Sequence, residues 1–478
     1  MAYKKSSAGP IALILVVSFV VFPFPLVDSI AKSDDEWIIT IDGESLELIP
    51  ELEEYAWVLE RPPYEIWDKI GLHRLVKTGE EPIGVIVIFP GTSSSGEQLI
   101  SEDYYLRYIA AIDADEEKVN EIREKRKSHS ITHYLALRGW DVYTMDYRTH
   151  FVPNTYTQDD LKFMAEWGWK MYMEDAELVI DKVKDVSGAD KVFLGGESFG
   201  GMAAMNYASM HWEEDLDGIV LLDGGTGGKQ SISDMLMGML PIEIPSLLLH
   251  LFPIVRQFVR PILELMTHLL GLYALDQSHD MGPLLNPIMT QLGVQPIPHY
   301  LEVREYALEH PLDPPLDPVT GKRLEPTKSS ITGEPFDNYI EWAAGLLAES
   351  RGTTNLYEGY NDVESSANVF FRFDRYWPLQ IYLELIADLL RPGYESDSGV
   401  WNRDYYNFYA HYDEIDVPLI AFISGFGLTM FGSFDPCIAN PDVTGYTLEE
   451  WGHLDVYTGT YNDVMVNEPT YQWLIDRT

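Results

Sequence analysis

Cysteine is nearly absent from this chain of 478 residues, which contains Cys437 and no other. A single cysteine excludes a disulfide within the chain, so the fold must depend on its apolar core for stability. The sequence also lacks the residue spacings of a metal site and the glycine-rich loop of a phosphate site. We therefore expect neither a metal nor a cofactor.

Basic residues are scarce as well. The chain has 33 Lys and Arg against 76 Asp and Glu, which gives a formal net charge of −43. Such a charge repels phosphate backbones and anionic lipid surfaces, so nucleic acid is not expected as a partner. Neither composition nor charge indicates an oligomeric state.

The amino-terminal residues have the layout of an export signal: Lys4 and Lys5 precede a long apolar run, and small residues follow it. This layout predicts a secretory signal peptide over residues 1–31, cleaved after Ala31. The alternative is an uncleaved anchor, although two prolines break the apolar run. We expect a secreted or extracytoplasmic protein whose mature chain has no membrane span.

Short apolar runs alternate with helical patterns along much of the chain. Strands made of continuous apolar residues are typical of a parallel sheet that is buried on both faces. The sequence therefore predicts an α/β protein with a mostly parallel sheet and helices on both faces. The expected strands are 84–91, 141–148, 191–196, 217–225, 417–425 and 443–450, and the expected helices are 114–129, 130–140, 160–188, 199–212 and 468–476.

This alternation stops between residues 224 and 413. We expect a core in two parts, 37–223 and 414–478, with a helical cap inserted over 224–413. Within the cap, residues 235–275 are apolar at more positions than a helix with one buried face needs, and charged residues interrupt the stretch. It could form a subdomain with its own core, an apolar substrate pocket, or both.

The sequence Gly196-Glu197-Ser198-Phe199-Gly200 fits the pattern G-x-S-x-G between an expected strand and an expected helix. Glycines on either side of the serine permit a sharp turn that presents the Ser198 hydroxyl as a nucleophile. The Phe199 N–H would then point at a developing oxyanion. The alternative is a plain strand-to-helix turn, and we assign no chemistry to Glu197.

A serine nucleophile requires a base, and His453 is the candidate. It lies on the loop after the last expected strand, in "EEWGHLDVYTG". A chain order of serine, acid and histidine would place the base there.

The segments "GGESFGG", "GWDVYTMDYR" and "GHLDVYTG" resemble the α/β-hydrolase superfamily, and the end of the chain resembles its acid-lipase and esterase branch. The resemblance implies Ser198 as nucleophile, His453 as base and a cap at the position of the inserted block. It also implies that the backbone N–H of Thr92 is the second oxyanion donor. Pro90 stands where the family usually has histidine, but only the backbone of that loop is needed.

The sequence offers more than one candidate for the acid of the triad. Similar lipases carry it just after the strand 417–425, where this chain has Gly425-Phe426-Gly427. We favour Asp223, which ends the preceding apolar strand and would there need a polar partner. Asp435, farther along the later loop, is the alternative, and Asp455 or a dyad without an acid is left open.

These features together predict an exported serine esterase or lipase that acts on a small hydrophobic ester through an acyl-enzyme. A peptidase or amidase of the same fold is one alternative. The other is a catalytically impaired protein that binds hydrophobic ligands, for which the missing acid is the best argument.

Overall fold

Two sheets organise the part of the chain that the computed structural model describes, which comprises residues 48–62, 64–225, 274–276, 297, 299–329, 333–350, 362–381, 411–431 and 438–478. The larger sheet has eight strands in the order β1-β2-β4-β3-β5-β6-β9-β10, and the smaller pairs β7 with β8. The strands are β1 Leu52–Glu60, β2 Lys69–Lys77, β3 Gly84–Phe89, β4 Trp140–Asp146, β5 Val192–Glu197, β6 Leu216–Leu222, β7 Ala274–Asp276, β8 Tyr376–Pro378, β9 Leu419–Ser424 and β10 Val443–Leu448.

All six strands expected from the sequence are present, as β3, β4, β5, β6, β9 and β10, and they pair in parallel. Their side chains enter two apolar cores. In β3, Ile86 and Ile88 belong to one core, while Val85 and Val87 belong to the other. Successive side chains of a strand point to opposite faces, so the sheet is buried on both faces as predicted.

The two amino-terminal strands were not among the predicted elements. β1 pairs antiparallel with β2, and β2 pairs antiparallel with β4. Charged residues recur along both strands, "LEEYAWVLE" and "KIGLHRLVK", so neither contains the continuous apolar run by which the other strands were recognised. β1 lies at the edge of the sheet and most of its residues are only partly buried, which accounts for this composition.

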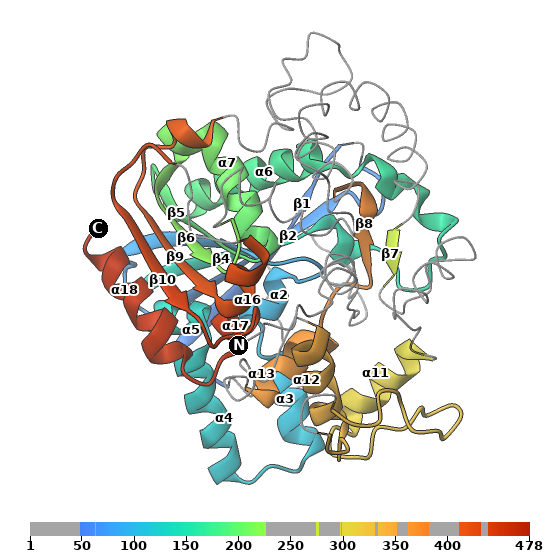
Figure 1. The fold of residues 1–478 in the computed structure, drawn as a ribbon. Helices are drawn as coiled ribbons and strands as arrows, with labels where there is room; N and C mark the ends of the chain where they lie inside the picture. Colours follow the sequence, from blue (N-terminus) through green and yellow to red (C-terminus); the bar gives the residue numbers. More distant parts are fainter. Residues whose placement is uncertain are drawn as a thin grey trace, which may run out of the picture.

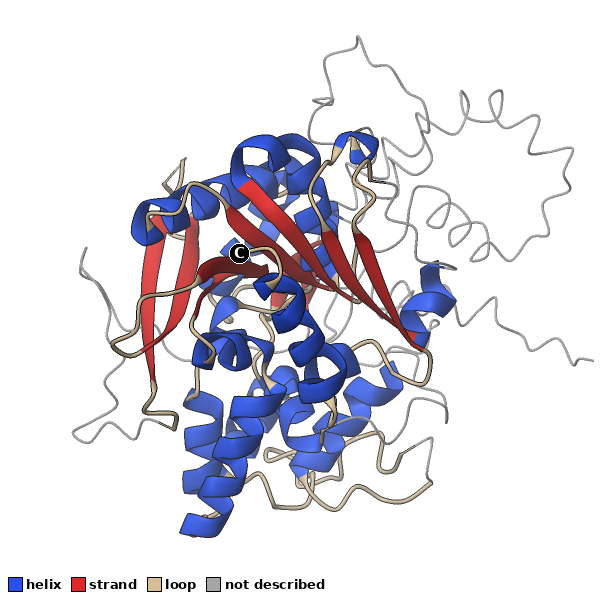
Figure 2. Cartoon of the chain, turned by 90° about the vertical axis from the view of Figure 1, so that its left-hand side faces the viewer, coloured by secondary structure: helices blue, strands red, loops and turns tan. Residues whose placement is uncertain are grey.

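Helices cover both faces of the sheet (Figures 1 and 2). Side chains of α6 and α7 pack into one core, and side chains of α5 and α18 pack into the other. The five helices expected from the sequence correspond to α4 to α7 and α18, except that α6 begins at Trp169 and a separate 3-10 helix, Asp160–Glu166, forms the start of the segment expected as one helix. The described helices of the core are α2 Gly96–Ile100, α3 Asp103–Ala111, α4 Glu116–His129, α5 Ile131–Leu137, α6 Trp169–Ser187, α7 Phe199–Asp215, α16 Gly425–Phe431, α17 Asp455–Thr458 and α18 Glu468–Ile475.

The inserted block is described in part. It contains α11 Tyr300–Glu309, α12 Tyr339–Ser350 and α13 Val363–Phe371, besides β7 and β8. Its apolar side chains join the same two cores as the sheet: Trp342 packs in the first, and Trp377 in the second. The apolar stretch 235–273 lies outside the described residues, as do the amino-terminal segment 1–31 and Asp435, so the predictions made for them stay predictions.

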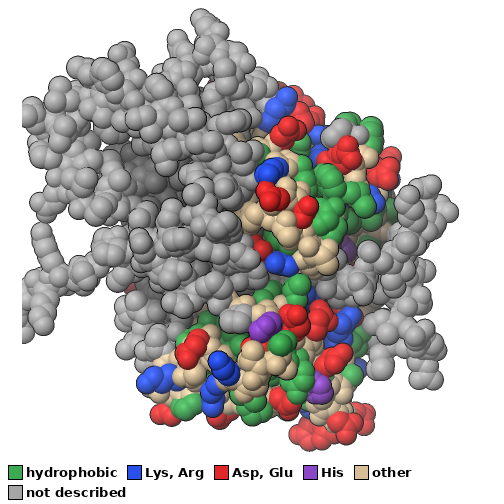
Figure 3. Space-filling view, turned by 90° about the vertical axis from the view of Figure 1, so that its right-hand side faces the viewer, with side chains coloured by type: hydrophobic (Ala, Val, Ile, Leu, Met, Phe, Trp, Pro, Cys, Tyr) green, Lys and Arg blue, Asp and Glu red, His purple; other side chains and the backbone are tan. Residues whose placement is uncertain are grey.

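The described part of the surface facing the viewer in Figure 3 carries acidic, basic and apolar side chains side by side. Within the ranges described above, no helix is both long and apolar enough to cross a membrane.

Candidate active site

Ser198 lies at the sharp turn between β5 and α7. Its backbone has φ 53° and ψ −116°, a conformation with positive φ that residues other than glycine rarely adopt. A side chain at Gly196 would begin 2.1 Å from the carbonyl oxygen of Gly200, so the turn tolerates no Cβ there. The N–H of Ser198 donates to the carbonyl of Leu222 at 3.0 Å. The turn predicted from G-x-S-x-G is therefore present, and it ties the serine to the end of β6.

His453 lies between β10 and α17, and its side chain is fully buried. Its Nε2 is 2.7 Å from Ser198 Oγ, and its Nδ1 is 2.6 Å from Asp223 Oδ2. When the Nδ1–H donates to the carboxylate, Nε2 is left to accept the hydroxyl proton of Ser198. The three side chains therefore form one hydrogen-bonded chain, although they lie far apart in the sequence.

Asp223 directly follows β6 and has a positive φ of 50°. Its backbone N–H donates to the carbonyl of Phe422 at 2.9 Å, which fixes it against the end of β9. Its carboxylate accepts the Ser424 backbone N–H at 2.7 Å and the Ser424 hydroxyl at 2.6 Å. Ser424 thus holds the acid in place. The sequence analysis did not identify Ser424, whose one local feature is that it is a polar residue at the end of an apolar strand.

The glycines beyond β9 also have a physical explanation. A side chain at Gly427 would begin 2.2 Å from Asp223 Oδ1, so the carboxylate of Asp223 fills the space that a residue at 427 would need. The Gly427 N–H donates to Ser424 Oγ at 2.9 Å, which completes the support of the acid. Helix α16 begins directly at Gly425, where the sequence suggested a loop.

Two further carboxyl groups lie close to this chain of hydrogen bonds. Glu197 Oε1 is 3.8 Å from His453 Nε2. Asp455 Oδ2 accepts the backbone N–H of Gly452 at 2.7 Å, which fixes the chain just before the histidine. Burial, with the charge of Asp223 nearby, raises the pKa of Asp455 to about 7, although the bond from Gly452 and the charge of His453 oppose the rise. Asp455 is therefore protonated below neutral pH.

The loop after β3 approaches the serine from the other side. A side chain at Gly91 would begin 3.3 Å from Ser198 Cβ, and the next residue, Thr92, is buried. Phe199 is the first residue of α7, and the first N–H groups of a helix have no partner within it. The two residues that the resemblance implies as oxyanion donors thus lie in segments that flank Ser198. Among the residues that the structure describes, no group of His, Cys, Asp and Glu could hold a metal ion.

Comparison with known proteins finds a partial family match and similar solved structures. A family model described as serine aminopeptidase, S33 matches residues 123–253, about a quarter of the chain. No curated protein matches the sequence.

Among solved structures, a "putative lipase" from Sulfolobus solfataricus is 26% identical, with a TM-score of 0.55 over 90% of this chain and 95% of that one. The naproxen esterase (carboxylesterase NP) from Bacillus subtilis is 12% identical, with a TM-score of 0.34 over 89% of this chain and 92% of that one. The sheet order, the turn at Ser198, the partial family match and the likeness to the Sulfolobus protein show that the chain has the α/β-hydrolase fold.

Proposed function

We propose that the protein is an exported serine hydrolase that cleaves carboxylic esters with an apolar acyl or alcohol group. The observation that carries the proposal is the buried chain of two short hydrogen bonds, 2.6 Å and 2.7 Å, from Asp223 through His453 to Ser198. The acidic residue is held by Ser424 and the serine by a strained turn, so the groups are in place before a substrate binds.

In the proposed mechanism, His453 Nε2 takes the hydroxyl proton of Ser198 as Oγ attacks the ester carbonyl. Asp223 holds the imidazole in the correct tautomer and stabilises its charged form. The backbone N–H groups of Phe199 and Thr92 stabilise the tetrahedral oxyanion. The imidazolium then protonates the leaving alcohol, and water hydrolyses the acyl-enzyme by the same path.

An ester substrate is supported by the resemblance of the carboxyl-terminal region to acid lipases and by the apolar composition of the inserted block. The proposal of export rests on the apolar segment and small residues within 1–31. Secretion tests it directly: the protein collected outside an expressing cell should begin at Lys32. Recovery of the full-length chain in the membrane fraction would instead favour the uncleaved anchor.

Hydrolysis of p-nitrophenyl esters of increasing acyl length, with fluorophosphonate labelling of the purified protein, tests the chemistry. We expect turnover and labelling in the native protein, and a loss on the order of 10⁴ to 10⁶ in rate for Ser198→Ala and for His453→Ala. Unchanged hydrolysis by folded Ser198→Ala would exclude this mechanism. A native protein with neither turnover nor labelling would favour the ligand-binding alternative.

A peptidase is the second candidate, and the partial match to the serine aminopeptidase family favours it. Aminoacyl p-nitroanilides distinguish the two. An esterase should hydrolyse esters far faster than anilides, whereas an aminopeptidase should require the free α-amino group of the anilide substrate.

A further inference from the structure

A segment of the inserted block contacts residues 91–98, which comprise the loop after β3 and the first residues of α2 and which we call the oxyanion loop. The backbone N–H of Asp374 donates to the carbonyl of Ser93 at 2.6 Å. Arg372 Nη2 is 2.7 Å from Glu97 Oε1. The end of α13 therefore contacts the oxyanion loop at two points, although more than 270 residues separate them in the sequence.

The contacted carbonyl belongs to a strained residue. Ser93 has a φ of 59°, in the left-handed region that costs a residue with a Cβ on the order of 1 kcal/mol or more. Such a conformation persists only where neighbouring groups hold it. Because Ser93 directly follows Thr92, the direction of its peptide groups is coupled to that of the Thr92 backbone.

Asp374 is itself held firmly. Its carboxylate accepts the Thr149 hydroxyl at 2.7 Å and lies 3.0 Å from His150 Nδ1, and its side chain is almost fully buried. Burial opposes the protonation of His150, but the carboxylates of Asp146, Asp374 and Glu97 outweigh it and raise the pKa of His150 to about 10. The imidazolium is thus the cation that faces Asp374 at neutral pH.

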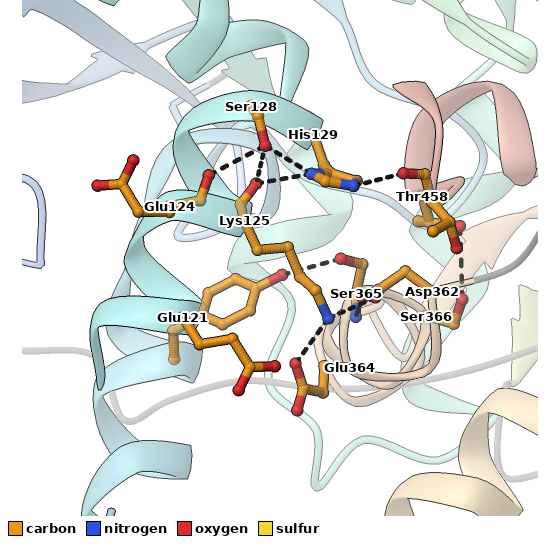
Figure 4. A network of polar contacts seen from close by, with 12 residues as sticks. Glu121, Glu124, Lys125, Ser128, His129, Asp362, Glu364, Ser365, Ser366 and Thr458 are labelled. Carbon is orange, nitrogen blue, oxygen red and sulfur yellow. Dashed lines mark hydrogen bonds and ion pairs between the residues drawn. The ribbon is translucent and has the colours of Figure 1, made fainter. Parts of the chain in front are cut away.

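The opposite end of α13 contacts the loop of the catalytic histidine. The N–H of Asp362, the residue before α13, donates to the carbonyl of Thr458 at 3.1 Å. Thr458 ends α17, five residues after His453. Figure 4 shows Lys125 of α4 reaching Asp362 and Glu364 at this end, with Nζ 2.6 Å and 3.0 Å from their carboxylates. We call residues 362–374 the bridging segment, since they join both loops.

We propose that Asp374 is a positioning residue of this hydrolase, which sets the oxyanion loop through Ser93, and that the bridging segment keeps this loop in place relative to the loop of His453. The inference rests on the function proposed above and adds a role for the inserted block besides covering the substrate. A group that acts on the oxyanion loop alone should affect the transition state more than substrate binding.

Asp374→Ala provides the test, with kcat and KM for p-nitrophenyl acetate and hydrogen exchange of residues 92–95 as the readouts. We expect kcat to fall about 10- to 100-fold with KM changed by less than about threefold, because an oxyanion donor is displaced and not removed. Asp374→Asn should retain part of the rate, since its amide oxygen can still accept from His150. Exchange at residues 92–95 should become faster in Asp374→Ala.

Asp317→Ala is the matched control, because Asp317 is also a buried aspartate of the inserted block and pairs with His299 at 3.0 Å. The Asp317 carboxylate also accepts hydrogen bonds within its own turn, from Val319 and Thr320. We expect it to lower stability while kcat stays within about twofold of native. Native kcat and native exchange in folded Asp374→Ala, or an equal loss of kcat in Asp317→Ala, would overturn the proposal.

Two safeguards keep the outcome decisive. If Asp374→Ala does not fold, the same measurements on Asp374→Asn and His150→Gln replace it. If the native protein neither hydrolyses esters nor reacts with a fluorophosphonate, the proposed function is wrong. Faster exchange at residues 92–95 in the Asp374 variants would then still support the positioning role, and unchanged exchange would reject it.

Discussion

Asp223 accounts for several neighbouring residues that otherwise look unrelated. Its carboxylate binds His453 and Ser424, and it fills the space beside Gly427 that a side chain would need. The position of the Asp223 carboxylate therefore explains why residue 427, beyond β9, is a glycine and not an acid. An aspartate at position 427 would therefore fit only if Asp223 were replaced by a smaller residue.

Asp223→Asn should lower the esterase rate by about 10³ to 10⁴. An amide can still hydrogen-bond to the imidazole, but it favours the wrong tautomer and cannot balance the imidazolium charge. The measurement is kcat/KM on a short p-nitrophenyl ester, with circular dichroism to verify the fold. Asp435→Asn is the control and should do far less; if it proves the more damaging change, the assignment of the acid is wrong.

Asp455 predicts a pH dependence of stability. Its pKa rises from an ordinary 3.8 to about 7 in the fold. Between these values the folded chain keeps a proton that the unfolded chain has lost, so this residue lowers stability as pH rises from about 4 to 7, and no further above. The Tm of Asp455→Asn should therefore exceed that of the native protein by a few degrees at pH 8 and not at pH 4.

Thermal unfolding at both pH values measures this difference. Asp413 is exposed, and Asp413→Asn is the control. The Tm difference between this variant and the native protein should be the same at pH 4 and at pH 8. An Asp455→Asn protein that is less stable than native at pH 8 would show that the carboxylate bond from Gly452 outweighs the cost of burying the charge.

Helices and strands with a distinct pattern in their own sequence were predicted. Strands that form because of contacts with distant parts of the chain were not. Apolar runs located the six parallel strands, because strands inside the sheet such as β3, β5 and β9 are buried on both faces, whereas β10 at the edge is only partly buried. β1 and β2 carry charged residues, and β7 and β8 have three residues each, so none has a distinct local pattern.

The residues of the candidate site also divide into those with a local sequence pattern and those without one. Ser198 and His453 stand in short motifs, and Asp223 could be inferred from the end of a strand. Ser424 and Asp374 act through partners about 200 or more residues away, which no local pattern reveals.

The described part of the inserted block also contributes to the core. Trp377 of β8 packs edge-on against Phe199, the first residue of α7, with ring centroids 5.1 Å apart. Tyr147 and Tyr172 contact the same indole. Because Phe199 is also a proposed oxyanion donor, this packing joins the inserted block to the nucleophile turn.

Trp377→Ala should therefore reduce both stability, by about 3–5 kcal/mol, and kcat. Trp140→Ala is the matched control: it removes an equally buried indole, which packs against Phe193 near the start of β5 and not against the nucleophile turn. It should destabilise by a similar amount without a matching loss of kcat. Denaturant unfolding and ester kinetics on both variants decide the matter, and equal kinetic losses would show that the packing around Phe199 has no special role.

For the molecule as a whole, charge is the dominant feature, with 76 acidic residues against 33 basic ones. Local ion pairs such as Lys118 with Glu364 offset only part of this excess, and partly exposed pairs contribute little. Repulsion among the remaining carboxylates opposes the compact state, and at physiological ionic strength salt largely screens this repulsion between charges more than about 8 Å apart.

The protein should consequently become more stable as NaCl rises from 0.05 to 0.5 M, with Tm increasing by a few degrees. Screening depends on ionic strength and not on the identity of the cation, so KCl should give the same curve. Sucrose, which favours burial without screening charge, is the control that separates the two effects. If Tm falls as NaCl rises, salt weakens the stabilising ion pairs more than it weakens the repulsion among carboxylates. The ion pairs would then be the larger electrostatic contribution to stability.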